Sequence, residues 1–305
     1  RVMERIRQNV FPVLAALIWG TAFVAQSVGA EYLEPFTFNA ARSIIAALAL
    51  TVVVWAFRRK AADTSVPQTP GSRRMLLIGG VCCGTALAVA SNFQQLGISG
   101  TSAGKASFIT ALYIVLVPIC GLFFHKRVRP LVWLSVAVAV VGLYCICVKE
   151  GFSITAGDFF VLICAFCFTV HILVIDYFTQ RTDGIALSCI QFYVAAAWSA
   201  LGMLFFESPS WEGLTACLPQ VLYVGVFSSA VGYTLQILAQ KGSNPTVVSL
   251  LLSLESVFGA LAGAVILGER MSGKEYFGCV LMLVAVVMAQ LPERHKTPKT
   301  APGKC

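Results

Sequence analysis

Charged residues are scarce in this chain. Asp, Glu, Lys and Arg make up 12% of its 305 residues, whereas hydrophobic residues make up 58% and the mean hydropathy is +0.81. A soluble domain has roughly 25% charged residues, which keep its surface in contact with water. The shortage of charge therefore excludes an ordinary soluble protein and indicates that lipid surrounds most of the molecule.

Sequence motifs for catalysis, nucleotide binding and metal binding are missing as well. The chain contains no HExxH, no G-x-S-x-G and no potassium-filter sequence. Gly104-Lys105 looks like the end of a phosphate-binding loop, but residue 99 is Ser instead of Gly and residue 106 is Ala instead of Ser or Thr. Nearly all eleven Cys lie in apolar stretches, and Cys164-x-x-Cys167 lacks a second pair of ligands. We therefore expect neither an enzyme nor an ATP-driven pump, and no metal or cofactor.

Long apolar stretches are abundant. A transmembrane helix needs about 20 mainly apolar residues, because in lipid each backbone amide must be bonded within its own helix. Ten stretches of this kind predict ten transmembrane helices, at residues 10–29, 35–57, 75–96, 103–124, 130–148, 155–178, 185–206, 214–238, 245–267 and 276–291. The first is of full membrane length, so we expect no cleavable signal peptide.

The basic residues predict the orientation of these helices. If the N terminus is inside, most Lys and Arg lie on the cytoplasmic side, and only Lys105, Lys149, Arg270 and Lys274 lie outside. Because cytoplasmic loops retain positive charge, we expect both termini to be cytoplasmic, in the cell (inner or plasma) membrane. The net charge of +8 then reflects topology and contact with anionic lipid, and it does not indicate a nucleic-acid partner.

The two halves of the chain have similar passages. Residues 101–128 (TSAGKASFITALYIVLVPICGLFFHKRV) correspond to residues 244–271 (NPTVVSLLLSLESVFGALAGAVILGERM). Each half has five predicted helices, and an odd number forces the second half to enter the membrane from the opposite face. We therefore predict an all-α integral membrane protein whose ten helices form two inverted five-helix repeats, 8–149 and 153–291, around a central cavity. We expect residues 292–305 to be a disordered cytoplasmic tail.

Four features of the sequence resemble a known family. They are WGTAF at residues 19–23, Pro35 followed by Arg42, and the two passages quoted above. In their order and spacing the chain resembles the EamA-type ten-helix carriers of the drug/metabolite transporter superfamily, over about residues 10–291. The sequence LGER at 267–270 looks like the end of that family's penultimate helix. The first half departs from this pattern, because it has FHKR at 124–127 where the second half has the acidic sequence LGER.

The resemblance implies a secondary transporter of small polar metabolites that works by alternating access. Transporters of this kind are commonly exporters of amino acids or related amines and carboxylates. The sequence TALY at 110–113 with Pro118 looks like a subgroup of the family that is often labelled carboxylate, amino-acid or amine transporters. An importer, or a carrier of nucleotide sugars or drug-like cations, stays open within the superfamily. From another class, a non-transporting receptor or scaffold stays open, although only residues 58–74 and the tail offer partner-binding segments.

Polar and aromatic side chains recur at helical spacing inside the predicted spans. Because such groups are costly in lipid, they usually face the interior of the bundle. Our candidates for contact with a small-molecule substrate are Trp19, Phe23, Gln26, Asn92, Gln95, Thr110, Tyr113, His171, Tyr233 and Gln236. The alternative is that they only connect helices by hydrogen bonds. A lone mid-membrane His such as His171 is more often a packing residue than a proton relay.

Glu255 and Arg42 are charged residues inside predicted helices. Glu255 follows Pro245 by ten residues, which at 1.5 Å per residue places it about 15 Å deep. It could bind a substrate ammonium group or take up a proton that is exchanged for substrate, in which case the proton is the coupling ion. The alternative is a structural pair with Arg42, which lies about a third of the way into its helix.

Overall fold

The chain folds into a bundle of helices that is suited to a membrane. The computed structural model describes residues 2–61, 70–101, 103–123, 128–148, 155–266 and 270–291, and these contain no β-strand. Ten spans are long and apolar enough to cross a membrane. The prediction of an all-α, ten-span membrane protein is therefore confirmed, while the predicted tail at 292–305 lies outside the described residues.

The elements follow the predicted order closely. The first half contains α1 (Val2–Gly29), α2 (Pro35–Ala61), α3 (Pro70–Ile98), α4 (Ala103–Thr110), α5 (Tyr113–Phe123) and α6 (Pro130–Cys147). The second half contains α7 (Ala156–Thr179), α8 (Gly184–Phe206), α9 (Trp211–Ala216), α10 (Leu218–Tyr223), the π-helix η1 (Val224–Gly232), α11 (Tyr233–Gln240), α12 (Pro245–Leu252), α13 (Glu255–Ile266) and α14 (Gly273–Gln290).

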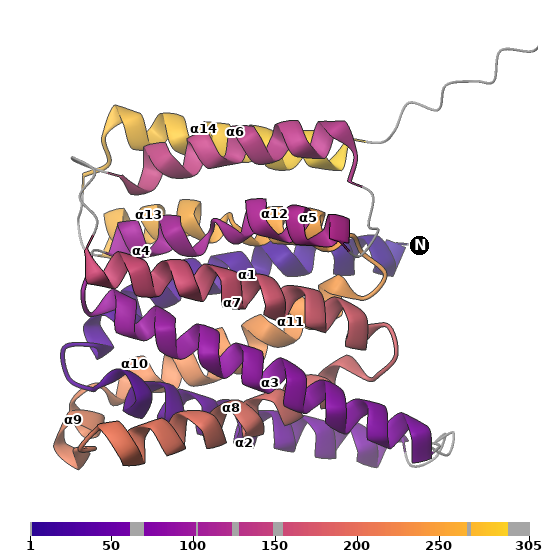
Figure 1. Ribbon diagram of the computed structural model, residues 1–305, viewed down its shortest axis with the longest axis vertical. Helices are drawn as coiled ribbons and strands as arrows, with labels where there is room; N and C mark the ends of the chain where they lie inside the picture. Colours follow the sequence, from indigo (N-terminus) through magenta and orange to yellow (C-terminus); the bar gives the residue numbers. More distant parts are fainter. Residues whose placement is uncertain are drawn as a thin grey trace, which may run out of the picture.

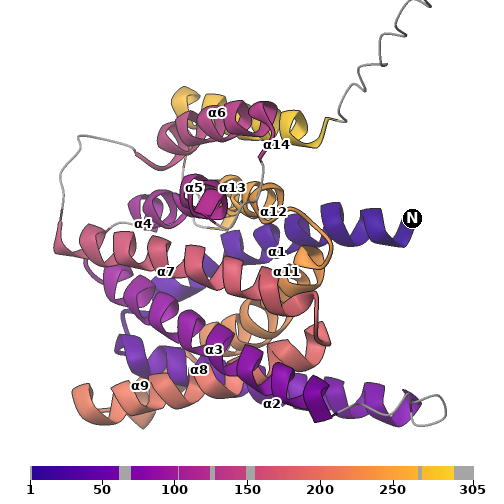
Figure 2. The same ribbon diagram turned by 45° about the vertical axis from the view of Figure 1, so that its right-hand side comes forward.

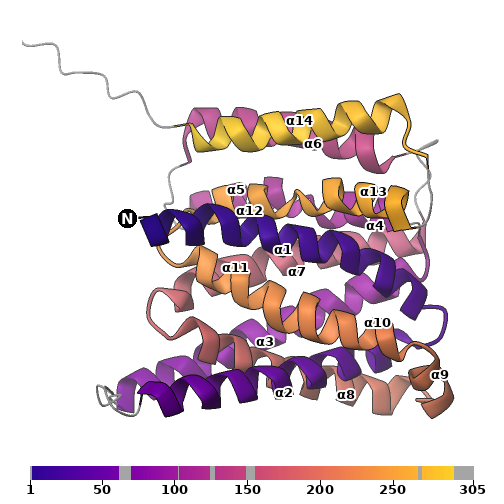
Figure 3. The ribbon, with the colours of Figure 1, turned by 180° about the vertical axis from the view of Figure 1, so that it is seen from behind.

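The helices are stacked along the long axis of the molecule (Figures 1 and 2). α6 packs on α14 at one end of this axis and α2 packs on α8 at the other. Between these pairs, α3 packs on α7, and α1 packs on α13 and on the α10–η1–α11 span, as the view from behind shows (Figure 3). Each end pair joins the same span of the two halves, which is what inverted repeats would produce. The repeat itself stays a prediction.

Two spans are interrupted near their middle, where the sequence predicted continuous helices. α4 ends at Thr110 and α5 begins at Tyr113, and α12 ends at Leu252 while α13 begins at Glu255. At both breaks a backbone N–H bonds the carbonyl three residues back instead of four, which tightens the turn. The predictions for 103–124 and 245–267 were wrong in this respect. The two breaks occupy the same span of each half, and broken membrane helices occur where backbone lines a cavity.

The eighth span also differs from the prediction. It begins at Leu218, because residues 211–216 form the separate short helix α9, for which Ser210 is the N-cap. Its central part, η1, is a π-helix, a wide form that is frequent at functional sites. Glycines bring other helices close to η1, since a Cβ added at Gly232 would lie 2.5 Å from Trp19 Nε1.

Large apolar side chains cover the outside of the bundle. Phe123, Phe205 and Val265 are examples that are at least 78% exposed. In water such a surface would be unfavourable, but lipid can cover it. The interior holds apolar side chains together with many polar ones, among them Arg42 and Glu255.

Candidate functional site

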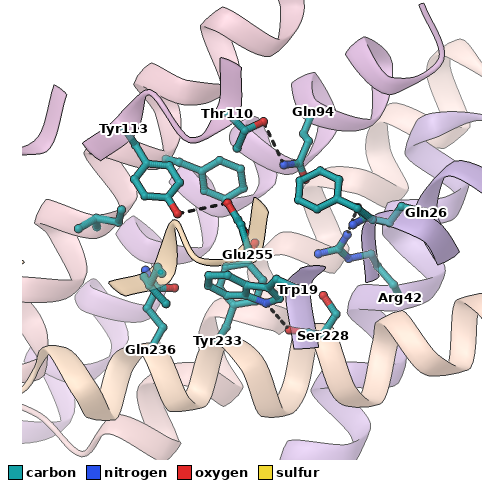
Figure 4. A pocket seen from close by; sticks show the side chains of 14 residues that line it. Trp19, Gln26, Arg42, Gln94, Thr110, Tyr113, Ser228, Tyr233, Gln236 and Glu255 are labelled. Atoms are coloured by element: carbon teal, nitrogen blue, oxygen red, sulfur yellow. Dashed lines mark hydrogen bonds between the residues drawn. The ribbon is translucent and has the colours of Figure 1, made fainter. Parts of the chain in front are cut away.

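A cavity lies in the middle of the bundle, at the level of the two helix breaks. Its volume is about 40 Å³, so it has room for only a few water molecules in this conformation. Fourteen residues line it: Trp19, Phe23, Gln26, Arg42, Gln94, Thr110, Tyr113, Phe168, Ile172, Ser228, Tyr233, Gln236, Leu252 and Glu255. They come from both halves of the chain, so the cavity lies between the halves (Figure 4).

Trp19 and Tyr233 form an aromatic wall of the cavity. Their ring centroids are 4.8 Å apart and the rings are tilted by 51°. Trp19 Nε1 donates a hydrogen bond of 3.0 Å to the backbone carbonyl of Ser228 in η1, and Gly232 leaves space for the indole. The π-helix therefore fixes the indole in place. Such a wall can hold an apolar side chain or an ammonium group.

Glu255 is the first residue of α13, and only 4% of it is exposed. A carboxylate is favourable at the N-terminal end of a helix, because free backbone N–H groups give that end partial positive charge. Tyr113 Oη, from the first residue of α5, donates to Glu255 Oε1 over 3.2 Å. This hydrogen bond connects the two helix breaks.

Arg42 reaches the cavity from α2 and is 3% exposed. Its Nε donates to Ser229 Oγ over 3.1 Å and its Nη1 donates to Gln26 Oε1 over 2.9 Å. Both acceptors are neutral. Within the described part of the chain no ion pair joins Arg42 to Glu255, so the structural pair considered above is not formed.

Gln236 has an unusual environment at the cavity wall. The residue is 1% exposed, and its Oε1 has no hydrogen-bond partner among the described residues. Leaving such an oxygen unpaired costs about 1–3 kcal/mol. A hydrogen-bond donor on a bound ligand or water would remove this cost.

The structure brings together most of the candidate residues predicted from the sequence. The candidates that line the cavity are Trp19, Phe23, Gln26, Arg42, Thr110, Tyr113, Tyr233, Gln236 and Glu255. Their contact with a substrate stays a prediction. The remaining three, Asn92, Gln95 and His171, are buried but do not line it.

These three residues connect helices instead. Asn92 Nδ2 donates to Ser199 Oγ over 3.0 Å, and its Oδ1 accepts from Asn39. Gln95 Nε2 donates to the carbonyl of Gln26 over 3.3 Å, and His171 Nε2 lies 3.1 Å from Gln191 Oε1. Polar side chains commonly connect membrane helices in this way.

Sequence reasoning missed Gln94, which lines the cavity beside Thr110. Gln94 Nε2 donates to Thr110 Oγ1 at the long distance of 3.5 Å. A signal was available, because Leu87, Ser91, Gln94 and Ile98 are spaced as one helical face and all four are buried. It competed with the equally regular face of Asn92 and Gln95.

Comparisons with known proteins point to transport. The model of the EamA-like transporter family matches residues 8–148 and 155–290. An uncharacterized transporter of Archaeoglobus fulgidus is 29% identical over 95% of this chain and 87% of its own length. The uncharacterized transporter YwfM of Bacillus subtilis is 23% identical over 96% of this chain and 97% of its own length. A plant relative, the chloroplastic WAT1-related protein At3g02690 of Arabidopsis thaliana, is 22% identical over 90% of this chain and 67% of its own length.

A solved crystal structure has a similar fold. It aligns with a TM-score of 0.76 and covers 93% of this chain and 96% of its own length, at 17% identity. At this identity the likeness concerns the fold alone. The arrangement of ten spans is therefore shared with a protein of distant sequence.

Proposed function

The chain belongs to the EamA-like transporter family, and from this premise we propose that it is a secondary carrier of small polar organic metabolites that works by alternating access. The observation that supports the proposal best is the central cavity. It combines one buried cation, one buried anion, amides and an aromatic wall at the level of two helix breaks.

The size of the cavity favours a carrier over an open pore. The cavity has a volume of about 40 Å³ in this conformation, so we expect helices or side chains to move when a metabolite enters. The lining comes from both halves, so a relative movement of the halves would enlarge it. Carriers with inverted repeats bind substrate at this level and open alternately to each side.

Amino acids or related amines and carboxylates are the substrates we propose, with export as the direction. We further propose that both termini are cytoplasmic, in the cell (inner or plasma) membrane, and that Glu255 exchanges a proton for the substrate. A nucleotide sugar fits less well, because its phosphates need several cations and Arg42 is the one cation among the described lining residues. A drug-like cation would leave Arg42 without a negative partner.

Reconstitution in liposomes tests this function. Purified protein would be assayed with labelled amino acids, amines and carboxylates under imposed proton or sodium gradients. We expect saturable flux for at least one of these compounds. We also expect Trp19→Ala to reduce it about tenfold or more, because the ring loses its contact with the substrate.

Trp198→Ala is the matched control. Trp198 is 51% exposed and bonds Thr85 away from the cavity, so its loss should leave flux nearly unchanged. Folded protein that transports none of the compounds would contradict the proposal and favour the receptor or scaffold. Equal losses in both Trp variants would show that the aromatic wall is not part of the substrate site.

A further inference from the structure

We infer that the cavity is a two-pole site that selects zwitterions, with the anionic group of the substrate at Arg42 and its ammonium group at Glu255. The inference rests on the proposed function, and it narrows the substrates from amines, carboxylates and amino acids to the class that has both charges. Figure 4 shows the basis: Arg42 enters from one side, Tyr113 and Gln236 lie on the other, and Glu255 and Trp19 lie between them.

The anionic pole, which is the place for the anionic group of the substrate, is built around the guanidinium of Arg42. This group has five N–H donors in a planar fork, a shape that matches a carboxylate. Two of its donors bond Gln26 Oε1 and Ser229 Oγ, which hold the guanidinium in place but supply no negative charge. A cation inside a membrane protein is expensive without a counter-charge. A substrate carboxylate would supply that charge and accept from the donors that remain.

The cationic pole, which is the place for the ammonium group of the substrate, is built around Glu255. Its carboxylate can accept about four hydrogen bonds, and Tyr113 Oη supplies one over 3.2 Å. A primary ammonium group has three donors, so it can use the free acceptor positions of Glu255. Gln236 adds a buried oxygen without a partner to the same lining, and the Trp19–Tyr233 wall adds two ring faces that attract cations.

One ligand must satisfy both poles to bind well. Arg42 and Glu255 line the same cavity without forming an ion pair, so neither charge cancels the other by contact. A simple amine would leave Arg42 without an anion, and a simple carboxylate would gain no ion pair at Glu255, which keeps its proton when no ammonium group is present. A zwitterion compensates both charges at once. The apolar lining residues Phe23, Phe168 and Leu252 would then face its side chain.

Matched probes test the assignment of the poles. The probes are leucine, phenylalanine, methionine and serine, each with its decarboxylated amine and its deaminated carboxylate. Binding is measured in detergent, because amines and acids leak through bilayers. For the amino acid that binds best, we expect wild-type affinity at least about tenfold higher than for either single-charge analogue.

Variants at each pole should lose different probes. Arg42→Gln should reduce binding of the carboxylate and the amino acid by about tenfold or more but not that of the amine, and Glu255→Gln should do the reverse. Gln236→Leu should weaken amine and amino acid without changing the carboxylate, which tests the cationic pole even if Glu255→Gln fails to fold. Arg42→Lys and Glu255→Asp keep the charges and should retain the preference for zwitterions.

Matched controls and defined outcomes complete the test. Arg181→Gln and Glu31→Gln remove the same charges from exposed positions and should leave all three affinities unchanged. An amine or carboxylate that binds or is transported as well as the amino acid would overturn the two-pole site and leave the carrier function standing. Equal losses for all three probes in both pole variants would also overturn it. If folded wild-type protein neither binds nor transports any compound, the proposed function itself fails.

Discussion

At the scale of single residues, the contact between Tyr113 and Glu255 connects the two interrupted spans. Each residue begins a helix segment after a break, and each is about 4% exposed. The phenol donates to the carboxylate, so the two segments are connected by their first side chains. Binding of an ammonium group at Glu255 would compete with this bond. In the site that we propose, its occupancy and the position of the two breaks would therefore be coupled.

The proposed role of Glu255 as the proton site gives a pH prediction. In the proposed export cycle Glu255 holds a proton when the site is empty and releases it when a substrate ammonium binds. An acidic exterior should therefore accelerate efflux from substrate-loaded, wild-type liposomes. Glu255→Gln cannot exchange a proton, so the efflux that remains should not respond to the gradient.

The variant should also fold, because Glu255 has no ion pair with Arg42 that its neutralisation would break. The control is Glu31→Gln, at an exposed position, which should keep the pH response. Folded Glu255→Gln protein with an unchanged response would exclude this residue as the coupling site. Tracer efflux with and without the gradient, together with the melting temperature, measures both effects.

Much of the site could be predicted from the sequence, because polar groups in lipid must face the interior and helical spacing shows which groups share a face. Trp19, Gln26 and Tyr233 were found in this way. The method cannot separate residues that face a cavity from residues that face another helix. His171 is as buried as Gln236, but a hydrogen bond to Gln191 occupies its Nε2. Only the three-dimensional arrangement separates these two cases.

At the scale of helices, glycine sets how closely α1 approaches α13. A Cβ added at Gly20 would lie 2.6 Å from the carbonyl oxygen of Glu255 and 2.6 Å from the amide nitrogen of Gly259. Both are backbone atoms, which cannot rotate away. The absence of a side chain at Gly20 therefore lets α1 pack against the first turns of α13 and places Trp19 in the cavity with Glu255.

Gly20→Ala should separate these helices. We expect a loss of about 1–3 kcal/mol in unfolding free energy, the usual cost of overpacking, and weaker substrate binding because Trp19 moves with α1. Gly273→Ala is the matched control, since nothing lies within 4 Å of a Cβ at that position. Thermal or denaturant unfolding in detergent measures the difference. A Gly20→Ala variant as stable as Gly273→Ala would show that the close contact does not determine the packing.

Helix positions were predictable, whereas helix breaks were not. Bilayer thickness sets the length of each apolar run, and residues such as Pro35, Pro130 and Pro245 mark helix starts. Neither break contains the Pro or Gly that usually ends a helix, since residues 110–113 read TALY and residues 252–255 read LSLE. The residues inside the breaks therefore contain no Pro or Gly signal from which the breaks could be predicted.

At the scale of the whole molecule, hydrogen bonds join the two halves near both ends of the bundle. At the end where α1 begins, Arg7 Nη2 donates to the carbonyl of Lys241 over 3.0 Å and Gln8 Nε2 donates to the carbonyl of Gly242. At the opposite end, the Glu207 carboxylate accepts from the backbone N–H and the hydroxyl of Thr37, each over 2.7 Å. Both sets of contacts are present while the cavity is small, so we expect each set to restrict one entrance in this conformation.

Alternating access requires these two sets of contacts to open in turn, and cross-linking tests this. In a background with native cysteines replaced, Cys pairs at Arg7 and Lys241, or at Thr37 and Glu207, would be joined by a short bis-methanethiosulfonate, which links two thiols through reducible disulfides. We expect either cross-link to reduce transport at least about tenfold, because one side of the cycle can no longer open, and reductant to restore it. Single-Cys variants treated with the same reagent are the control. Binding of the best amino acid should survive with each cross-link alone, because the cavity can still open at the other end. Full transport under either cross-link would mean that the halves do not separate at that end, and the movement we propose would be wrong.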